Sequence, residues 1–150
     1  MSVHTPIEIR IDSDPKHLCV VRAAVEQAAM RLGFDEKQAG QIMLAVDEAL
    51  TNVIRHGYKG ARDKPIWIKL RTATNNGTAM EIVIEDEAAD CDPATFRGRD
   101  LDDIRPGGLG THIIRNTMDS TEYTRRPGGR GIRLTMRRQL DDEAKREPAA

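Results

Sequence analysis

Apolar and polar positions follow one another along the chain in patterns that predict its strands and helices. Residues 7–11 read Ile-Glu-Ile-Arg-Ile, a strict alternation that predicts a half-buried strand. Residues 15–32 and 35–56 instead carry apolar side chains three and four positions apart, which is typical of helices with one buried face. Asp35 and Gln38 have the spacing of a capping box at the start of the second helix. The first part of the chain is therefore predicted to form one strand followed by two helices.

The second part of the chain is predicted to consist mainly of strands. Four segments alternate in polarity, and they are 65–72, 79–85, 121–126 and 131–138. Turn signals at 75–78 and 127–129 join these segments into two hairpins. Residues 86–106, between the hairpins, are polar and lack a clear period, and so long an irregular stretch is usually functional or mobile. A short helix is predicted over about 111–118.

This order of elements, β-α-α-β-β-loop-α-β-β, predicts the fold class. Its strands pair mainly as hairpins and its helices fall in two places. We therefore expect an α+β two-layer sandwich, in which helices lie on one face of a mixed, mostly antiparallel sheet. The length of 150 residues suits one domain, predicted over 1–140, and the charged tail 141–150 is expected to be disordered.

Composition narrows the class of protein. Lys and Arg number 23 against 24 Asp and Glu, and the absence of a basic excess argues against a general nucleic-acid binder. The two cysteines, Cys19 and Cys91, make neither a metal motif nor a disulfide framework. No apolar run has the length of a signal peptide or the ~20 residues of a membrane span. These features predict a soluble, cytoplasmic protein.

A line of polar side chains runs along the second predicted helix. Glu48 and Asn52 are four residues apart, so they lie one above the other on the same face. They are either the solvent edge of an amphipathic helix or a site for a cation and a hydroxyl. In the second case a carboxylate can accept a proton from an attacking hydroxyl, and an amide oxygen suits Mg²⁺. His56 continues the line, and we assign it no chemistry.

Two further signals point to a nucleotide. Residues 107–110 read Gly-Gly-Leu-Gly at the start of a predicted helix, where backbone N–H groups and the helix dipole favour a phosphate, and Thr111 adds a hydroxyl. An ordinary turn before a helix is the alternative, and the sequence matches neither a Walker loop nor a Rossmann fingerprint. Asp86 ends a predicted strand. Its carboxylate could accept a hydrogen bond from the exocyclic amine of adenine, and the alternative is an ordinary aspartate that forms a turn at the end of a strand.

Taken in order, these signals resemble the Bergerat ATP-binding fold of the GHKL superfamily. The matching segments are Asp47-Glu-Ala-Leu-Thr-Asn-Val-Ile-Arg-His56, Ile82-Val-Ile-Glu-Asp86, Gly107-Gly-Leu-Gly110 and Gly131-Ile-Arg-Leu-Thr-Met136. That superfamily includes histidine-kinase catalytic domains, gyrase-type ATPases and heat-shock-90 chaperones. Within it, the helix motif and the short length resemble the bacterial anti-sigma-factor serine/threonine kinases over residues 7–138.

The resemblance implies a role for individual residues. Glu48 matches the general base that activates a serine or threonine hydroxyl of the protein substrate. Asn52 matches the ligand of Mg²⁺, and Asp86 matches the acceptor of the adenine amine. Thr135 matches a threonine that supports the adenine site. The loop that covers the phosphates matches Gly108, Leu109, Gly110 and Thr111, and 87–106 matches a mobile lid.

The implied function is that of an ATP- and Mg²⁺-dependent kinase that is also an anti-sigma factor. Such proteins typically form homodimers, hold a sigma factor inactive and phosphorylate an anti-sigma-factor antagonist. An ATP-binding partner-switching module with little or no kinase activity is the alternative. A detached histidine-kinase catalytic domain is a third reading, although no histidine-bearing dimerisation helix is recognised. Arginines 97, 99 and 105 flank the lid and either reach phosphates or are solvated.

One segment departs from the family pattern. The family usually has Asp-x-Gly-x-Gly after the second strand of the first hairpin, whereas here Ala88 and Asp90 replace both glycines. If either position needs a positive φ, we expect strain of about 1 kcal/mol. The residues altered in this way adjoin the expected adenine site.

Overall fold

Strands and helices of the computed structural model follow the predicted order closely. The structure describes residues 6–74, 77–88 and 109–141. Its strands are β1 (Ile7–Asp12), β2 (Pro65–Ala73), β3 (Ala79–Asp86), β4 (Ser120–Arg125) and β5 (Ile132–Gln139). Its helices are α1 (Leu18–Leu32), α2 (Glu36–Asn52) and α4 (Leu109–Thr117), with a 3₁₀ turn at Pro15–His17 and a π-helical turn at Val53–Gly57. Most of the loop and tail predictions, at 89–106 and 142–150, lie outside the described residues.

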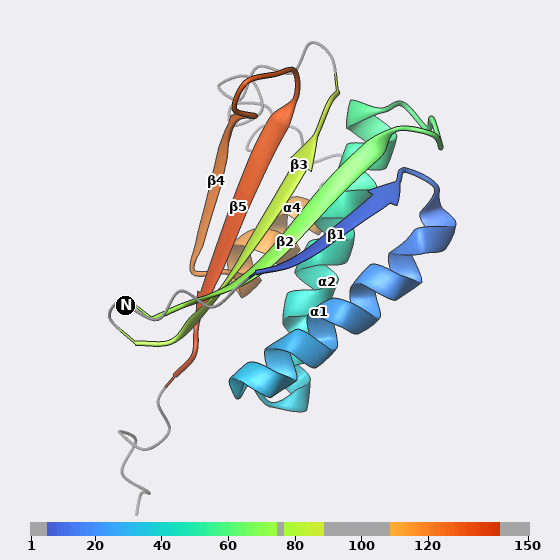
Figure 1. Ribbon diagram of the computed structural model, residues 1–150. Helices are drawn as coiled ribbons and strands as arrows, with labels where there is room; N and C mark the ends of the chain where they lie inside the picture. The colour runs from blue at the N-terminus through green and yellow to red at the C-terminus, as the bar shows by residue number, and fades with distance from the viewer. Residues whose placement is uncertain (1–5, 75–76, 89–108, 142–150) are drawn as a thin grey trace, which may run out of the picture.

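The five strands form one sheet in the order β1-β2-β3-β5-β4 (Figure 1). All four pairings are antiparallel, so the described sheet is antiparallel rather than mixed. Ile84 of β3 lies opposite Ile68 on one side and Leu134 on the other. These three side chains are buried, which fixes the register because a slip of one residue would turn them to the other face.

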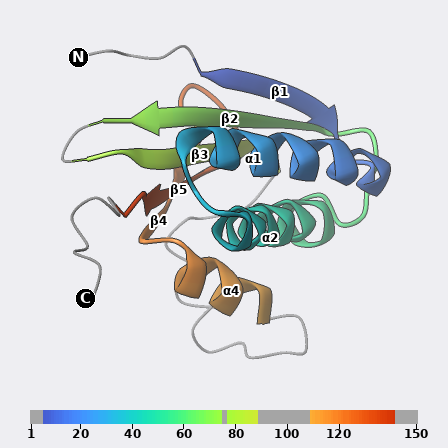
Figure 2. The same ribbon diagram turned by 90° about the horizontal axis from the view of Figure 1, so that it is seen from below.

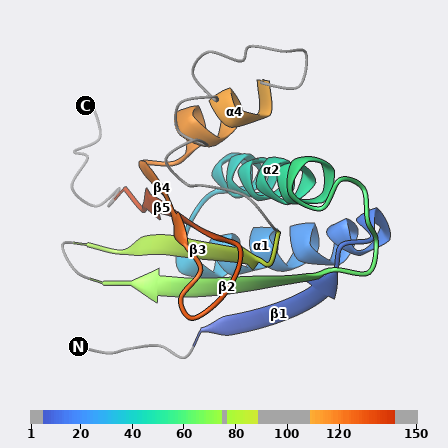
Figure 3. The same cartoon turned by 90° about the horizontal axis from the view of Figure 1, so that it is seen from above.

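All three helices lie on the same side of the sheet, as Figures 2 and 3 show, and the predicted α+β sandwich is confirmed. Helix α2 packs against α1 and against α4, so it is the middle helix of this layer. The core between the layers is almost wholly aliphatic, as 3% aromatic residues require. The other face of the sheet carries charged side chains paired across strands, for example Arg133 with Glu85 at 2.7 Å.

Side-chain hydrogen bonds stabilise the start of α2. Asp35 accepts from the backbone N–H of Gln38 at 2.7 Å, and the Gln38 side chain accepts from the N–H of Asp35 at 3.0 Å, which confirms the capping box. Gly33 ends α1 with a φ of 121°. No helix in the described ranges is both long and apolar enough to span a bilayer.

Candidate functional site

A cleft opens where the end of α2, the end of β3 and the start of β5 meet. Its empty space, counted together with open solvent, is about 440 Å³. Its walls are mostly apolar and are formed by Ala49, Asn52, Val53, Gly57, Ile84, Asp86, Ala88, Tyr123, Ile132 and Leu134. The fold therefore brings together two of the site residues expected from sequence, Asn52 and Asp86.

Asp86 is buried in the wall of this cleft, with 6% of its surface exposed. Its Oδ1 accepts from the backbone N–H of Ala88 at 2.9 Å and from that of Ile132 at 3.3 Å. Neither bond uses Oδ2, so among the residues that the structure describes this oxygen remains available as an acceptor. Burial raises the pKa of Asp86, and the two backbone hydrogen bonds and then Arg126 act in the opposite direction.

Gly131 allows β5 to reach Asp86. A Cβ at this position would lie 1.8 Å from the carbonyl oxygen of Asp86, and the φ of Gly131 is 107°. Both facts exclude a side chain. Gly131 lies at the start of a strand predicted from alternation, and no local signal in the sequence gives it a role. Its contact joins segments 45 positions apart, so the fold is needed to reveal it.

The turn after β3 is also held from the far side of the sheet. Arg126 pairs with Glu85 at 3.5 Å and with Glu87 at 3.2 Å, and its guanidinium lies 4.0 Å from the centre of the Trp67 ring. Asp86, between the two glutamates, points to the helix side. The alternation of the strand therefore separates a charged outer brace from the buried carboxylate.

Ala88 does not adopt the positive φ on which the expected strain depends. Among the described non-glycine residues only Lys59 has a positive φ, so Ala88 does not need the glycine that the family usually has. Its side chain is buried, and a Cβ added to Gly57 would lie 3.1 Å from the Cβ of Ala88. The missing side chain at Gly57 thus leaves room for the methyl group of Ala88. Asp90 lies outside the described residues.

Glu48 and Asn52 lie on α2, and both are partly exposed. Neither side chain makes a hydrogen bond or ion pair with any other residue in the described part of the chain. Oxygen donors of these two kinds suit Mg²⁺, which is often held by one or two protein groups together with substrate phosphates. The described residues contain no group of three or more His, Cys, Asp or Glu side chains that could hold a metal by themselves.

The remaining residues expected at the site are less well supported by the fold. Thr135 lies opposite Val83 and between the buried Leu134 and Met136, so the alternation of β5 turns it to the face away from the helices. The structure does not bring Thr135 to the cleft. Gly108 lies outside the described residues. Helix α4 begins at Leu109, about two residues before the predicted start, and of Leu109, Gly110 and Thr111 only the backbone is described.

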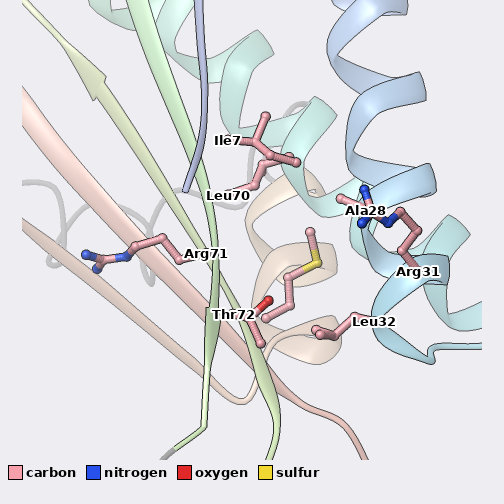
Figure 4. A pocket seen from close by; sticks show the side chains of 8 residues that line it. Ile7, Ala28, Arg31, Leu32, Leu70, Arg71 and Thr72 are labelled. Atoms are coloured by element: carbon pink, nitrogen blue, oxygen red, sulfur yellow. The ribbon is translucent and has the colours of Figure 1, made fainter. Parts of the chain in front are cut away.

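A larger hollow lies elsewhere, between α1, the start of β1 and the end of β2 (Figure 4). Its lining includes Ile7, Ala28, Leu32, Leu70 and Met80. Arg71 also borders it, but Figure 4 shows its side chain pointing away, and its guanidinium pairs with Glu81. None of the residues singled out in the sequence lines this hollow. We place the site in the smaller cleft because polar groups converge there.

Known proteins with similar sequences match nearly the whole chain. Residues 11–137 match the histidine kinase-like ATPase domain family. The serine-protein kinase RsbW of Halalkalibacterium halodurans is 31% identical over 132 residues, which cover 81% of this chain and 78% of that protein. The serine-protein kinase RsbW of Listeria innocua is 24% identical over 156 residues, which cover 99% of this chain and 96% of that protein.

A solved structure supports the fold. The RsbU and RsbW domains of Rv1364c from Mycobacterium tuberculosis superpose with a TM-score of 0.60 at 17% identity. The superposition covers 91% of this chain and 33% of that one, so this chain spans about a third of that structure.

Proposed function

We propose a function for this chain, which belongs to the histidine kinase-like ATPase domain family and, within it, to the bacterial anti-sigma-factor kinases: it is an ATP-dependent serine/threonine protein kinase and an anti-sigma factor. The observation that carries the proposal is the meeting of Asn52 and Asp86 in one cleft. These side chains come from different layers of the sandwich. One ligand in the cleft can thus reach both groups. The amide of Asn52 suits the metal ion that binds the phosphates, and the carboxylate of Asp86 suits the amine of adenine.

The adenine end of the site is the Asp86 wall. Oδ1 is held by two backbone N–H groups, and Oδ2 is left to accept from the exocyclic amine of adenine. Guanine has a carbonyl at the corresponding position, which would face the carboxylate as a second acceptor. A fixed buried acceptor of this kind disfavours a ligand that cannot donate to it, because the acceptor then stays unpaired.

The phosphate end of the site is the polar line of α2. Asn52 would hold Mg²⁺, which neutralises charge on the phosphates when bound. The hydroxyl oxygen of a serine or threonine on the protein substrate attacks the γ-phosphorus, the bond to the β–γ bridging oxygen breaks, and ADP leaves. Glu48 accepts the hydroxyl proton. The backbone N–H groups at the start of α4 and residues 108–111 would cover the phosphates.

The partners in this proposal are proteins. An anti-sigma-factor antagonist supplies the phosphorylated hydroxyl, and a sigma factor is the sequestered target. The protein would act in the cytoplasm as a homodimer. The alternative is an ATP-binding partner-switching module with little or no kinase activity, and the observation in its favour is the methyl group of Ala88 where the family usually has glycine.

Transfer of labelled γ-phosphate to the antagonist protein tests the proposal. We expect Mg²⁺-dependent labelling on serine or threonine, and a loss of about 10²- to 10⁴-fold in rate for Glu48→Gln with nucleotide affinity retained. Glu36→Gln, an exposed position at the start of the same helix, is the matched control and should leave the rate unchanged. ATP-dependent antagonist binding without labelling would favour the module. Labelling that survives Glu48→Gln would refute Glu48 as the base.

A further inference from the structure

The hydroxyl of Tyr58 joins three segments beside the cleft. It donates to the carbonyl oxygen of Pro65 at 2.6 Å and accepts from the backbone N–H of Glu87 at 2.7 Å. The backbone N–H of Tyr58 itself donates to Val53 at 2.8 Å, within the π-helical turn that follows Asn52. One side chain therefore connects the end of the helix that carries Asn52, the start of β2 and the residue after Asp86.

These bonds leave the turn after β3 with little freedom. The N–H of Glu87 is held by Tyr58, and the N–H of Ala88 is held by Asp86 Oδ1. The Tyr58 hydroxyl is the only one of these anchors that comes from the α2 side of the molecule rather than from the strands. Without it, the bonds to Asp86 would hold the turn to β5, and the position of the turn relative to α2 would rest on the packing of Ala88 beside Gly57.

We propose that Tyr58 is a positioning residue for the nucleotide base. Its hydroxyl fixes the turn Asp86–Ala88 relative to α2, so that the free oxygen of Asp86 meets the adenine amine while Asn52 serves the phosphates. This inference rests on the proposed function and adds a determinant of base selectivity that neither touches the base nor belongs to the expected motif residues.

The surroundings of Tyr58 suit this role. The residue is 9% exposed, and this burial raises the pKa of Tyr58 to about 12. The backbone hydrogen bond from Glu87 is the next largest influence, and it lowers the pKa. Asp86 and Glu87 also raise it, and Arg126 lowers it. The phenol therefore keeps its proton at neutral pH and can donate to Pro65 and accept from Glu87 at once.

A second buried hydroxyl provides a matched control. Ser13 Oγ donates to the carbonyl oxygen of Ala61 at 2.5 Å and accepts from the N–H of Lys64 at 3.1 Å. It ties the loop before β2 to the end of β1, as Tyr58 ties the same region to β3. Ser13 is fully buried and does not line the cleft. Losing either hydroxyl should lower the free energy of unfolding. Of the two, only the Tyr58 hydroxyl holds the residue next to Asp86.

The experiment measures ATP and GTP affinities by calorimetry for the full chain, Tyr58→Phe and Ser13→Ala. For Tyr58→Phe we expect a roughly 3- to 10-fold loss of ATP affinity, the worth of about one hydrogen bond, with GTP affinity unchanged. In the kinase assay KM for ATP should rise by a similar factor while kcat is retained. Ser13→Ala should keep the wild-type ratio of affinities, although both variants should have a lower Tm.

The outcomes separate the inference from the proposed function. Wild-type protein that binds no ATP would overturn both. Wild-type protein that binds ATP, with Tyr58→Phe retaining the ATP to GTP ratio, would overturn the inference alone. Hydrogen exchange of the wild-type chain gives a second measurement that does not depend on the folding of a variant. The Glu87 amide should exchange slowly without nucleotide, and fast exchange there would refute the anchor.

Discussion

The two walls of the cleft differ in how far the protein itself fixes their functional groups. On the strand side, Asp86 is buried and its Oδ1 accepts two backbone hydrogen bonds, and the next residue is held by Tyr58. On the helix side, Asn52 lines the cleft, Glu48 lies one turn earlier on α2, and neither makes a polar contact with other residues that the structure describes. The groups assigned to base recognition are thus preorganised, whereas those assigned to phosphoryl transfer are left for a ligand to engage.

This difference follows from the secondary structure of each wall. The end of a strand offers N–H groups outside the ladder, and Ala88 and Ile132 direct theirs at one carboxylate. Inside α2 the backbone groups are paired with one another, so side chains on its surface can be held only by neighbouring side chains or a ligand. The strand wall should therefore be sensitive to backbone geometry, and the helix wall to the chemistry of single side chains.

Gly131→Ala should have the largest effect, because it breaks the strand wall directly. The new Cβ would overlap the carbonyl of Asp86 at 1.8 Å in a backbone conformation with φ of 107°. We expect a loss of roughly 3–5 kcal/mol in the free energy of unfolding, from overlap and backbone strain together. Urea denaturation measures this loss, and ATP binding should fall with it.

Gly128→Ala is the matched control for that variant. Gly128 also has a positive φ, 73°, but a Cβ there would meet no atom within 4 Å. Gly128→Ala should therefore lose only about 1 kcal/mol in the free energy of unfolding, from backbone strain alone. Equal losses for the two variants would show that the approach to Asp86 is not what Gly131 provides.

Asp86→Asn should change the chemistry of the strand wall while keeping its geometry. The amide oxygen can accept from Ala88 and Ile132 as the carboxylate does. The amide nitrogen would replace the free oxygen and present a donor to the adenine amine. We expect about a 10- to 100-fold loss of ATP affinity, and no loss of GTP affinity, by calorimetry.

The effect of Asp86→Asn on the free energy of unfolding should depend on pH. Burial raises the pKa of Asp86, so folding favours the protonated carboxyl. The stability that this proton contributes is complete below the unfolded-state pKa and is lost as the pH rises through the folded-state pKa. At neutral pH Asp86→Asn should be at least as stable as the wild type, and its advantage should disappear in acid. A variant less stable than the wild type at neutral pH would contradict this account.

Ala88→Gly should have the smallest effect, and it tests whether the departure from the family pattern impairs the strand wall. Removing a buried methyl group and adding backbone freedom should lower the free energy of unfolding by roughly 1–2 kcal/mol. Because Ala88 has no positive φ, restoring glycine should not tighten ATP binding. A marked gain in affinity would show instead that the methyl group obstructs the nucleotide.

The sequence patterns predict the elements well because each pattern is local. Alternation locates β2 and β3 to within one residue at each end, and Asp35 with Gln38 marks the start of α2. Contacts between distant segments are different in kind. The Tyr58–Glu87 bond spans 29 positions, and no local pattern records it.

Thr135 shows a related limit. The strand that contains it was predicted from alternation, but a motif match does not establish which face of the strand a residue occupies. Leu134 and Met136 are buried, so Thr135 faces away from the helices. Asn52 and Asp86, in contrast, meet as expected, because the packing of α2 on the sheet brings the end of each element to the same place.

Titration of ATP with and without Mg²⁺ into the wild type and Asn52→Ala tests most directly whether the two walls form one ATP site. We expect the wild type to bind ATP more tightly with Mg²⁺ than without it. Asn52→Ala should lose about tenfold in affinity when Mg²⁺ is present and little when it is absent, because Asp86 still holds the base. A wild type that binds no ATP, or an equal loss of ATP affinity with and without Mg²⁺, would contradict a single ATP site formed by the two walls.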